Sequence, residues 1–168
     1  MNKSTSYKFE VKRNWHLIDA KSQNFGRIAT QIAALLQGKD KTYFSPQADC
    51  GDFVILVNTK YLKVSHPAKW DKKIYYHYSG YPGGIKDISL RDAMAKNPNT
   101  VIRKAVSNML PKNKLRSLRI DRLKLFIEEK EGKELYDAMK KKLANKKSQP
   151  AVESQKPVSK PKVVSSKQ

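Results

Sequence analysis

The sequence has few cysteines, few acidic residues and no long apolar runs, and each shortage excludes a class of protein. Cys50 is the only cysteine among 168 residues, which excludes an internal disulfide and a cysteine-cluster metal site. A single cysteine also fits a reducing cytoplasm or organelle interior. No segment approaches the ~20 apolar residues of a membrane-spanning helix, and the N-terminus lacks the apolar core of a signal peptide. These features predict no membrane association.

Recognisable catalytic motifs are also missing. His16, His66 and His77 are scattered along the chain without evident partners. There is no Gly-x-Ser-x-Gly, His-Glu-x-x-His or Walker phosphate loop. Asp49 and Asp52 enclose a Cys-Gly pair, and carboxylates so placed are far more often turn residues than metal ligands. We therefore expect no catalytic residue, no cofactor, no metal and no small-molecule substrate.

The scarcity of acidic residues leaves a large excess of positive charge. Lys and Arg number 35 against 15 Asp and Glu, which gives a formal net charge of +20. Such an excess is the electrostatic signature of a nucleic-acid-binding protein. The densest cationic stretch holds Lys112, Lys114, Arg116, Arg119, Arg122 and Lys124, opposed only by Asp121. Charges this close repel one another unless a polyanion lies beside them, so the stretch predicts a contact surface for RNA or DNA.

Alternating strand and helix patterns indicate an α/β fold. A continuous apolar run at 53–57, rich in β-branched residues, predicts a strand buried on both faces, as in parallel sheets. The other predicted elements are strands at 15–18 and 123–127, extended pieces at 61–64 and 73–78, and helices at 25–37, 99–110 and 131–145, with a short capped helix between Ser89 and Pro98. Gly38 is expected to end the first helix.

Four regions follow from these patterns. Residues 1–12 form an N-terminal extension, 13–127 an α/β domain and 128–145 a C-terminal amphipathic helix. The basic tail, 146–168, lacks periodicity and is expected to be disordered, because it cannot bury enough apolar area to offset chain entropy.

An aromatic and basic segment includes the second extended piece and the loop after it. Lys72 and Lys73 precede Tyr75, Tyr76, His77, Tyr78, Tyr81, Gly83, Gly84 and Lys86. Tyrosine rings stack on unpaired bases, and glycines let the backbone approach a sugar-phosphate chain closely. The alternative is an amphipathic strand whose alternate tyrosines belong to the core. This alternative explains any single tyrosine better than it explains the whole segment.

Two further segments carry cations at the ends of the first predicted helix. Lys39 and Lys41 follow its C-terminus, where they complement the helix dipole or contact phosphate. Arg27 lies in its first turn, where free N–H groups hold a phosphate or are satisfied by a simple cap at Asn24. The sequence leaves both pairs of interpretations open.

Several of these segments resemble, in order and spacing, the ribosomal protein L-thirteen family of the large subunit, of bacterial or organellar type. The resemblance covers about residues 13–127, and the matching stretches are Trp15–Ala20, Gly26–Ala29, Gly38–Lys41, Ser45–Pro46 with Asp49–Asp52, Asn58, Tyr75–Lys86 and Met109–Leu115. Each stretch alone is a weak signal, but seven in register are specific.

The resemblance implies a three-layer α/β/α fold around a small, mostly parallel sheet. It also implies a structural role in the large subunit, binding of its ribosomal RNA early in assembly, neighbouring large-subunit proteins and no enzymatic activity. The absence of a leader-like segment favours a bacterial cytoplasm over an organelle. The RNA-binding residues that we expect are Arg27, Lys39, Lys41, Lys72, Lys73, Tyr75, Tyr76, His77, Tyr78, Tyr81, Gly83, Gly84, Lys86, Lys112, Lys114, Arg116, Arg119, Arg122 and Lys124.

The sequence also departs from the family pattern. Asn108 replaces a usual glycine, Arg116-Ser117 replaces Gly-Arg, and the family's C-terminal element gives way to the helix beyond Glu128. Contacts of that C-terminal element therefore do not transfer. The rival functions are a free-standing RNA-binding regulator, for example of messenger RNA, an RNA-modifying enzyme and a cationic membrane-surface protein. The last two lack a catalytic cluster and a broad apolar helical face, respectively.

Changing Lys112, Lys114 and Arg116 together to Ala should weaken RNA binding sharply while folding survives. These three cations are expected to contact phosphates, so their loss removes counterion release without removing core packing. Filter binding to the purified ribosomal RNA site measures the effect. Unchanged affinity would refute the predicted contact surface.

Overall fold

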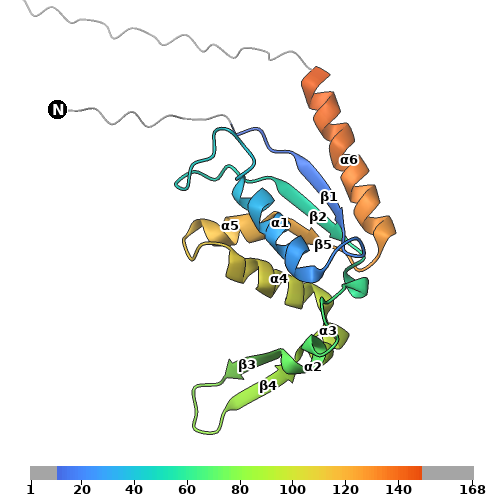
Figure 1. Ribbon diagram of the computed structural model, residues 1–168. Helices are drawn as coiled ribbons and strands as arrows, with labels where there is room; N and C mark the ends of the chain where they lie inside the picture. The colour runs from blue at the N-terminus through green and yellow to red at the C-terminus, as the bar shows by residue number, and fades with distance from the viewer. Residues whose placement is uncertain (1–10, 149–168) are drawn as a thin grey trace, which may run out of the picture.

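The centre of the molecule is a three-stranded parallel sheet. A computed structural model describes residues 11–148, with side chains described through residue 142. The strands β1 (Trp15–Asp19), β2 (Phe53–Val57) and β5 (Leu123–Leu125) lie in the order β1–β2–β5 (Figure 1). Parallel pairing places Ile18 beside Leu56 and Leu56 beside Leu125. The predicted parallel sheet is confirmed, although β5 ends two residues earlier than expected.

One face of the sheet is covered by α1 (Phe25–Gln37), α4 (Pro98–Met109) and α5 (Leu115–Asp121). The fully buried side chains that form this core are Val54, Leu56 and Leu123 from the sheet, Ile28, Ile32 and Leu36 from α1, and Ile102 and Val106 from α4. The predicted limits of α1 are confirmed, and Gly38 caps it with a φ of 77°. Helix α5 was not predicted.

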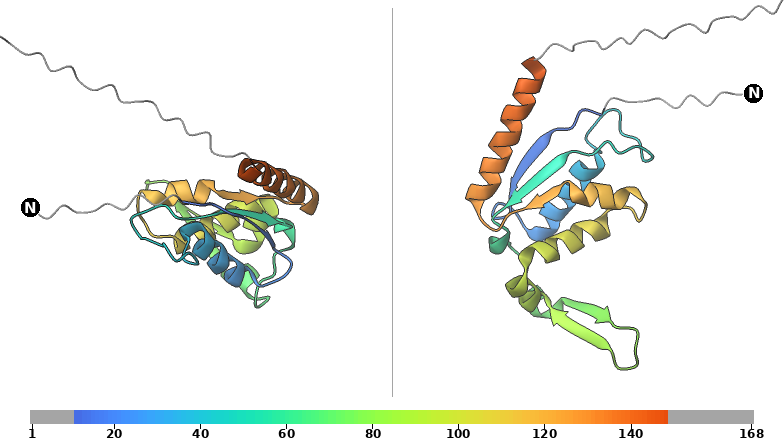
Figure 2. Two further views of the ribbon diagram at one scale, coloured as in Figure 1. Left: turned by 90° about the horizontal axis from the view of Figure 1, so that it is seen from above. Right: turned by 180° about the vertical axis from the view of Figure 1, so that it is seen from behind.

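The opposite face is covered by the C-terminal helix α6 (Glu129–Ser148), which contacts β1 and β2. Alternation along β2 points Val57 away from Leu56 and toward this helix. Gly132 permits the contact, since a Cβ there would lie 2.2 Å from Val57 Cγ1. Figure 2 shows α6 and the other helices on opposite sides of the sheet, which confirms the three-layer α/β/α architecture.

The expected terminal regions lie mostly outside the described part of the chain. Residues 1–10 of the N-terminal extension and 149–168 of the basic tail are not described. Residues 146–148, which we assigned to a disordered tail, continue α6 instead. Their lysines extend the Lys-rich helical pattern by one more turn.

Between β2 and α4 the chain leaves the sheet to build a separate hairpin (Figure 1). The elements of this excursion are the 3₁₀ turn η1 (Thr59–Tyr61), α2 (Lys69–Lys72), β3 (Ile74–Tyr78), β4 (Ile85–Ser89) and α3 (Leu90–Lys96). The extended piece at 73–78 is confirmed as β3. The one at 61–64 is wrong except for a single bridge at Lys63, because Asn58 enters the left-handed region at φ 61° and starts the turn η1.

Side-chain caps fix where α3 and α4 begin. Ser89 Oγ accepts the N–H of Asp92 at 3.2 Å, which confirms the N-cap half of the predicted capping box, whereas the Asp92 carboxylate accepts the Ser89 hydroxyl at 2.7 Å in place of the backbone N–H. Asn97 Oδ1 accepts the N–H of Asn99 at 3.0 Å, and Pro98 occupies the first position of α4. Successive capped starts hold the base of the hairpin against α4.

Replacing Gly132 by Ala should destabilise the protein by about 1–2 kcal/mol, because the added methyl group overlaps a buried valine and forces α6 off the sheet. Urea unfolding followed by circular dichroism measures the change. Gly26→Ala is the matched control, since nothing lies within 4 Å of the position that its Cβ would take and alanine favours helix. Equal midpoints for Gly132→Ala and the natural protein would contradict this account of the contact.

Candidate nucleic-acid interface

A groove of about 830 Å³ lies between the start of α1, the helix α2 and the last turns of α4. Its walls carry the cations Arg27, Lys69, Lys72 and Lys73 together with Tyr75. Four of these five residues were predicted from separate stretches of sequence, and the fold brings them to one place. Lys69 was missed, although it belongs to the same lysine-rich run as Lys72 and Lys73.

The N-terminus of α1 opens into this groove. Asn24 and Gly26 line it, and the Asn24 side chain makes no capping hydrogen bond within residues 11–148. The first turn contains Arg27 and no acidic residue. A helix N-terminus carries partial positive charge, so backbone and side chain contribute charge of the same sign. The sequence left open whether Asn24 caps this helix or its free N–H groups hold a phosphate. The side-chain cap is not formed.

Two further hollows continue from the groove around α4. One, of about 280 Å³, shares Tyr75 with the groove, and the other, of about 580 Å³, shares Thr100 and Lys104 with the first. The seven cations that line the three hollows, here named the basic belt, are Arg27, Lys69, Lys72, Lys73, Lys96, Arg103 and Lys104. Within the described part of the chain, no Asp or Glu lines any of the three.

The belt residues Lys96, Arg103 and Lys104 were not predicted from the sequence. For α4, helical spacing was the available signal, because positions 100, 103, 104 and 107 lie on the side of the helix opposite its buried residues. The apolar stripe of α4 predicts the helix, and its polar side would have pointed to the belt.

The tyrosines of the hairpin separate into two environments. Tyr75 is half-buried, and Lys73 and Lys104 lie over its ring with Nζ 5.7 and 4.9 Å from the centroid. Burial raises the pKa of the Tyr75 hydroxyl, which stays neutral. Tyr76, Tyr78 and Tyr81 are exposed at 66%, 59% and 75%. The interpretation that alternate tyrosines are packed inward therefore holds for Tyr75 alone.

Strand pairing gives the hairpin two different faces. His77 pairs with Lys86 on the face of Tyr75, whereas Tyr78 pairs with Ile85 on the face of Tyr76. The geometry of the turn between β3 and β4 accounts for glycine in that turn. Gly83 has a φ of 72°, and a Cβ at Gly84 would lie 1.9 Å from Ser79 Oγ. The turn therefore favours glycine at Gly83 whether or not a ligand approaches it, whereas a side chain at Gly84 would have to displace the Ser79 hydroxyl.

The cationic stretch at 112–124 is divided between surface and interior. Lys112, Lys114 and Lys124 are exposed, and Arg116 is half-buried at the start of α5. Arg119 and Arg122 are only 2% and 7% exposed. Their predicted place on a contact surface is wrong, because the stretch folds into α5 and turns these two side chains toward an internal carboxylate.

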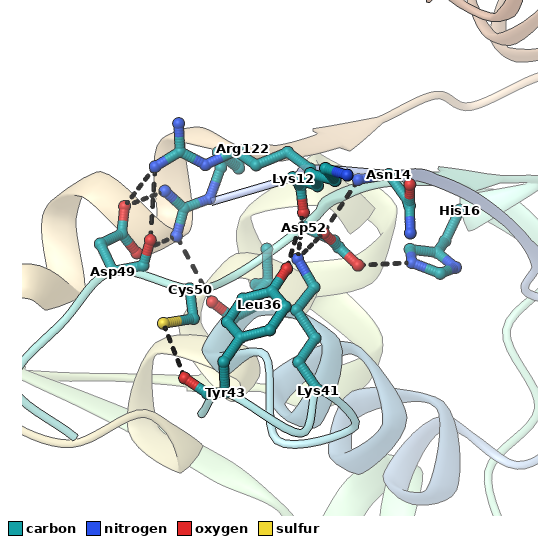
Figure 3. A network of polar contacts seen from close by, with 11 residues as sticks. Lys12, Asn14, His16, Leu36, Lys41, Tyr43, Asp49, Cys50, Asp52 and Arg122 are labelled. Carbon is teal, nitrogen blue, oxygen red and sulfur yellow. Dashed lines mark hydrogen bonds and ion pairs between the residues drawn. The ribbon is translucent and has the colours of Figure 1, made fainter. Parts of the chain in front are cut away.

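That carboxylate is Asp49 (Figure 3). Both terminal nitrogens of Arg122 donate to it, while Arg119 Nε lies 3.9 Å and Arg13 3.3 Å away. Burial alone raises the pKa of Asp49, but the hydrogen bonds and charge of Arg122, with the charges of Arg13 and Arg119, outweigh it and lower the pKa. One carboxylate therefore joins β5, α5 and the segment before β1.

Asp52 forms a second centre close by. Lys41 pairs with its Oδ1, His16 Nε2 lies 2.9 Å from its Oδ2, and the N–H of Asn14 donates to it at 2.9 Å. Burial opposes ionisation, but Lys41 and the other donors prevail and lower the pKa of Asp52. Lys41 is half-buried and its side chain, 11% exposed, is paired with Asp52, whereas Lys39 is exposed.

The interpretation of Asp49 and Asp52 as turn residues was therefore incomplete, since both also form ion pairs with distant residues. Among residues 11–148, no three His, Cys, Asp or Glu side chains gather where they could hold a metal ion. No helix in that range is long and apolar enough to cross a membrane.

Fold and surface together define a class: a small, basic α/β protein with cation-lined, acid-free hollows of the kind that suit a nucleic-acid backbone. A family model described as "Ribosomal protein L13" matches residues 13–132. The chain belongs to the ribosomal protein L13 family.

Curated relatives agree with this assignment. The chain is 47% identical over 119 residues to "Large ribosomal subunit protein uL13" of Thermosipho africanus, which covers 71% of this chain and 79% of the relative. It is 50% identical over 117 residues to the protein of that name from Clostridioides difficile, covering 70% and 81%. The match to the Geobacter sulfurreducens protein is 46% over 119 residues, covering 71% and 82%.

Replacing Asp49 by Asn should lower the free energy of unfolding at pH 7 by about 3 kcal/mol, because two buried arginines lose their counter-ion. The folded-state pKa of Asp49 is lowered, so its stabilisation is present above about pH 4 and is lost as the pH falls through the folded-state pKa. The difference between variant and natural protein should therefore shrink on acidification, as measured by urea unfolding from pH 7 to pH 3.

Asp71→Asn is the matched control. Asp71 pairs with Arg91 at 3.2 Å, but both side chains are about two-thirds exposed, 64% and 66%. Exposed pairs contribute at most about 1 kcal/mol. Equal losses of stability for the two variants would contradict the importance given to Asp49.

Proposed function

We propose that this protein is a structural constituent of the large ribosomal subunit that binds large-subunit ribosomal RNA through the basic belt and the exposed hairpin, and so supports subunit assembly and translation. The main support for this RNA-binding surface is the arrangement of its charges. Seven cations from four separate segments line contiguous hollows, and no described acidic side chain lines them. Like charges gathered in this way repel one another until a polyanion neutralises them.

The shape of the surface favours RNA recognised by its backbone and by unpaired bases. Double-helical RNA hides its base edges in a deep, narrow groove, so phosphate, 2′-hydroxyl and stacking contacts dominate its recognition. The basic belt supplies the cations for phosphates. Tyr76, Tyr78 and Tyr81 supply exposed rings on a hairpin that projects from the domain (Figure 1).

The marginal stability expected of the hairpin also supports the proposal that it is bound to a partner. An isolated two-stranded hairpin is marginally stable in water. Here Ile74 and Ile85 are exposed at 36% and 64% on the same face as Tyr76 and Tyr78. Contact with RNA removes this apolar surface from water and orders the hairpin further.

The exposed cations Lys39, Lys112, Lys114 and Lys124, with Arg116, extend the proposed RNA contacts beyond the belt. Arg119 and Arg122 are left out because they are buried and paired, and Lys41 because its side chain, 11% exposed, is paired with Asp52. We also propose neighbouring large-subunit proteins as partners, a non-enzymatic role and a place on the cytoplasmic ribosome of a bacterium, in line with the bacterial relatives. Sucrose-gradient sedimentation separates this proposal from a free-standing regulator, which would sediment mainly away from ribosomes.

Binding to large-subunit ribosomal RNA should depend steeply on salt. If about 8 cations contact phosphates, log affinity should fall with log salt at a slope of roughly −6 to −7. The triple variant Arg27→Gln, Lys72→Gln, Lys73→Gln removes three belt cations and should reduce that slope by about 2–3. Filter binding across a salt series measures both values.

The matched control removes three charges from α6 through Lys130→Gln, Lys140→Gln and Lys141→Gln, all exposed positions outside the belt. Its slope should stay closer to that of the natural protein than the belt variant's does. A natural slope near −1, or equal slopes for the two triple variants, would count against the proposed surface.

A further inference from the structure

The smallest hollow of the belt has a chemistry of its own. It lies between the base of the hairpin and the first turns of α4, and its volume is about 280 Å³. Ile88, Ala93 and Val101 give it apolar walls beside the ring of Tyr75. At the edge of the volumes of about 300–1,000 Å³ that small-molecule sites occupy, it has room for one planar ring system and is too small for a helix or strand.

The polar groups of this hollow are mainly hydrogen-bond donors. Asn97 uses its side-chain oxygen to cap α4, which leaves its Nδ2 hydrogens available. The Thr100 hydroxyl makes no side-chain hydrogen bond with the described residues and lies one helical turn away. Donors in this position match a base edge that presents carbonyl or ring-nitrogen acceptors, as guanine and uracil do.

The cations around the hollow favour a negatively charged occupant. Lys96 and Lys104 line the hollow, and Lys104 Nζ lies 4.9 Å from the centre of the Tyr75 ring. The described chain places no carboxylate among the lining residues. A flexible lysine side chain can leave the ring when another planar group stacks there, and its ammonium group then meets the phosphate attached to that group.

We propose that this hollow accepts one unstacked base of large-subunit ribosomal RNA. The base stacks on Tyr75, Asn97 and Thr100 donate to its edge, and Lys96 and Lys104 hold the flanking phosphates. Recognition of splayed bases on aromatic side chains is a general mode of sequence-specific RNA binding. The inference rests on the proposed function, because it requires that the RNA reach the basic belt.

Filling the hollow tests the inference. Ala93→Leu places three extra carbons inside it, whereas Ala95→Leu places the same group on an exposed position of the same helix. Loss of one base–aromatic stack should weaken binding of the full chain to large-subunit ribosomal RNA by about 5- to 150-fold for Ala93→Leu. Ala95→Leu should bind like the natural protein, and circular dichroism checks that both variants fold.

A second pair of variants tests the stacking ring without filling the hollow. Tyr75→Phe keeps the ring and should retain binding, whereas Tyr75→Leu keeps an apolar side chain but removes the stack and should weaken binding within the same range. Carbodiimide probing of the RNA adds a direct readout, because it modifies the Watson–Crick edges of unpaired guanine and uracil. One such base should be protected by the natural protein and by Ala95→Leu, but not by Ala93→Leu.

The outcomes separate this inference from the proposed function. Tight binding by the natural protein with equal affinities for Ala93→Leu and Ala95→Leu would overturn the base site alone, as would equal binding by Tyr75→Phe and Tyr75→Leu. A natural protein without affinity for large-subunit ribosomal RNA would overturn the proposed function and this inference with it.

Discussion

The fold depends on the ion pair between Asp49 and Arg122. Asp49 lies just before the central strand β2, and Arg122 lies just before β5, so their contact sets the relative position of two neighbouring parallel strands. The same arginine donates to the carbonyl of Leu36 at the end of α1. One guanidinium group therefore connects the sheet, a helix end and the segment that leads into the sheet.

A chain of net charge +20 folds because its cations are divided between two tasks. Arg119, Arg122 and Lys41 turn inward and share Asp49 and Asp52, where low solvent exposure strengthens each pair. The belt cations turn outward around hollows without an acidic partner in the described chain. Asp49 and Asp52 thus hold the framework, and the surface keeps its positive potential for a polyanion.

The pattern of apolar residues predicted the strands and the main helices well, because burial in the core imposes that pattern. The β-branched run of β2 and the apolar stripe of α1 were placed to the residue. Linear charge density predicted the interior poorly, because it does not report direction: Arg116 and Arg119 are neighbours on a helix, yet one is half-buried and the other fully buried.

The hairpin and the belt show where sequence patterns stop being informative. Strand β4 escaped prediction since Ile85, Lys86 and Asp87 are all exposed and follow no burial pattern. Lys104 lies on the polar side of α4, a local signal that was not used, whereas Lys96 reaches the belt only through the packing of α3 and α4 against the hairpin. Such a site depends on long-range contacts that no local stretch of sequence records.

The parallel order β1–β2–β5 has a consequence for the time course of folding. Arg122 must find Asp49 across 73 residues of chain, and the whole hairpin excursion lies within the loop that this contact closes. Closing long loops is entropically costly and slows folding in proteins dominated by non-local contacts. Until β5 arrives, the edge of β2 stays unpaired and Asp49 lacks its main partner. A chain that stops short of β5 therefore lacks both the third strand of the sheet and the main partner of Asp49.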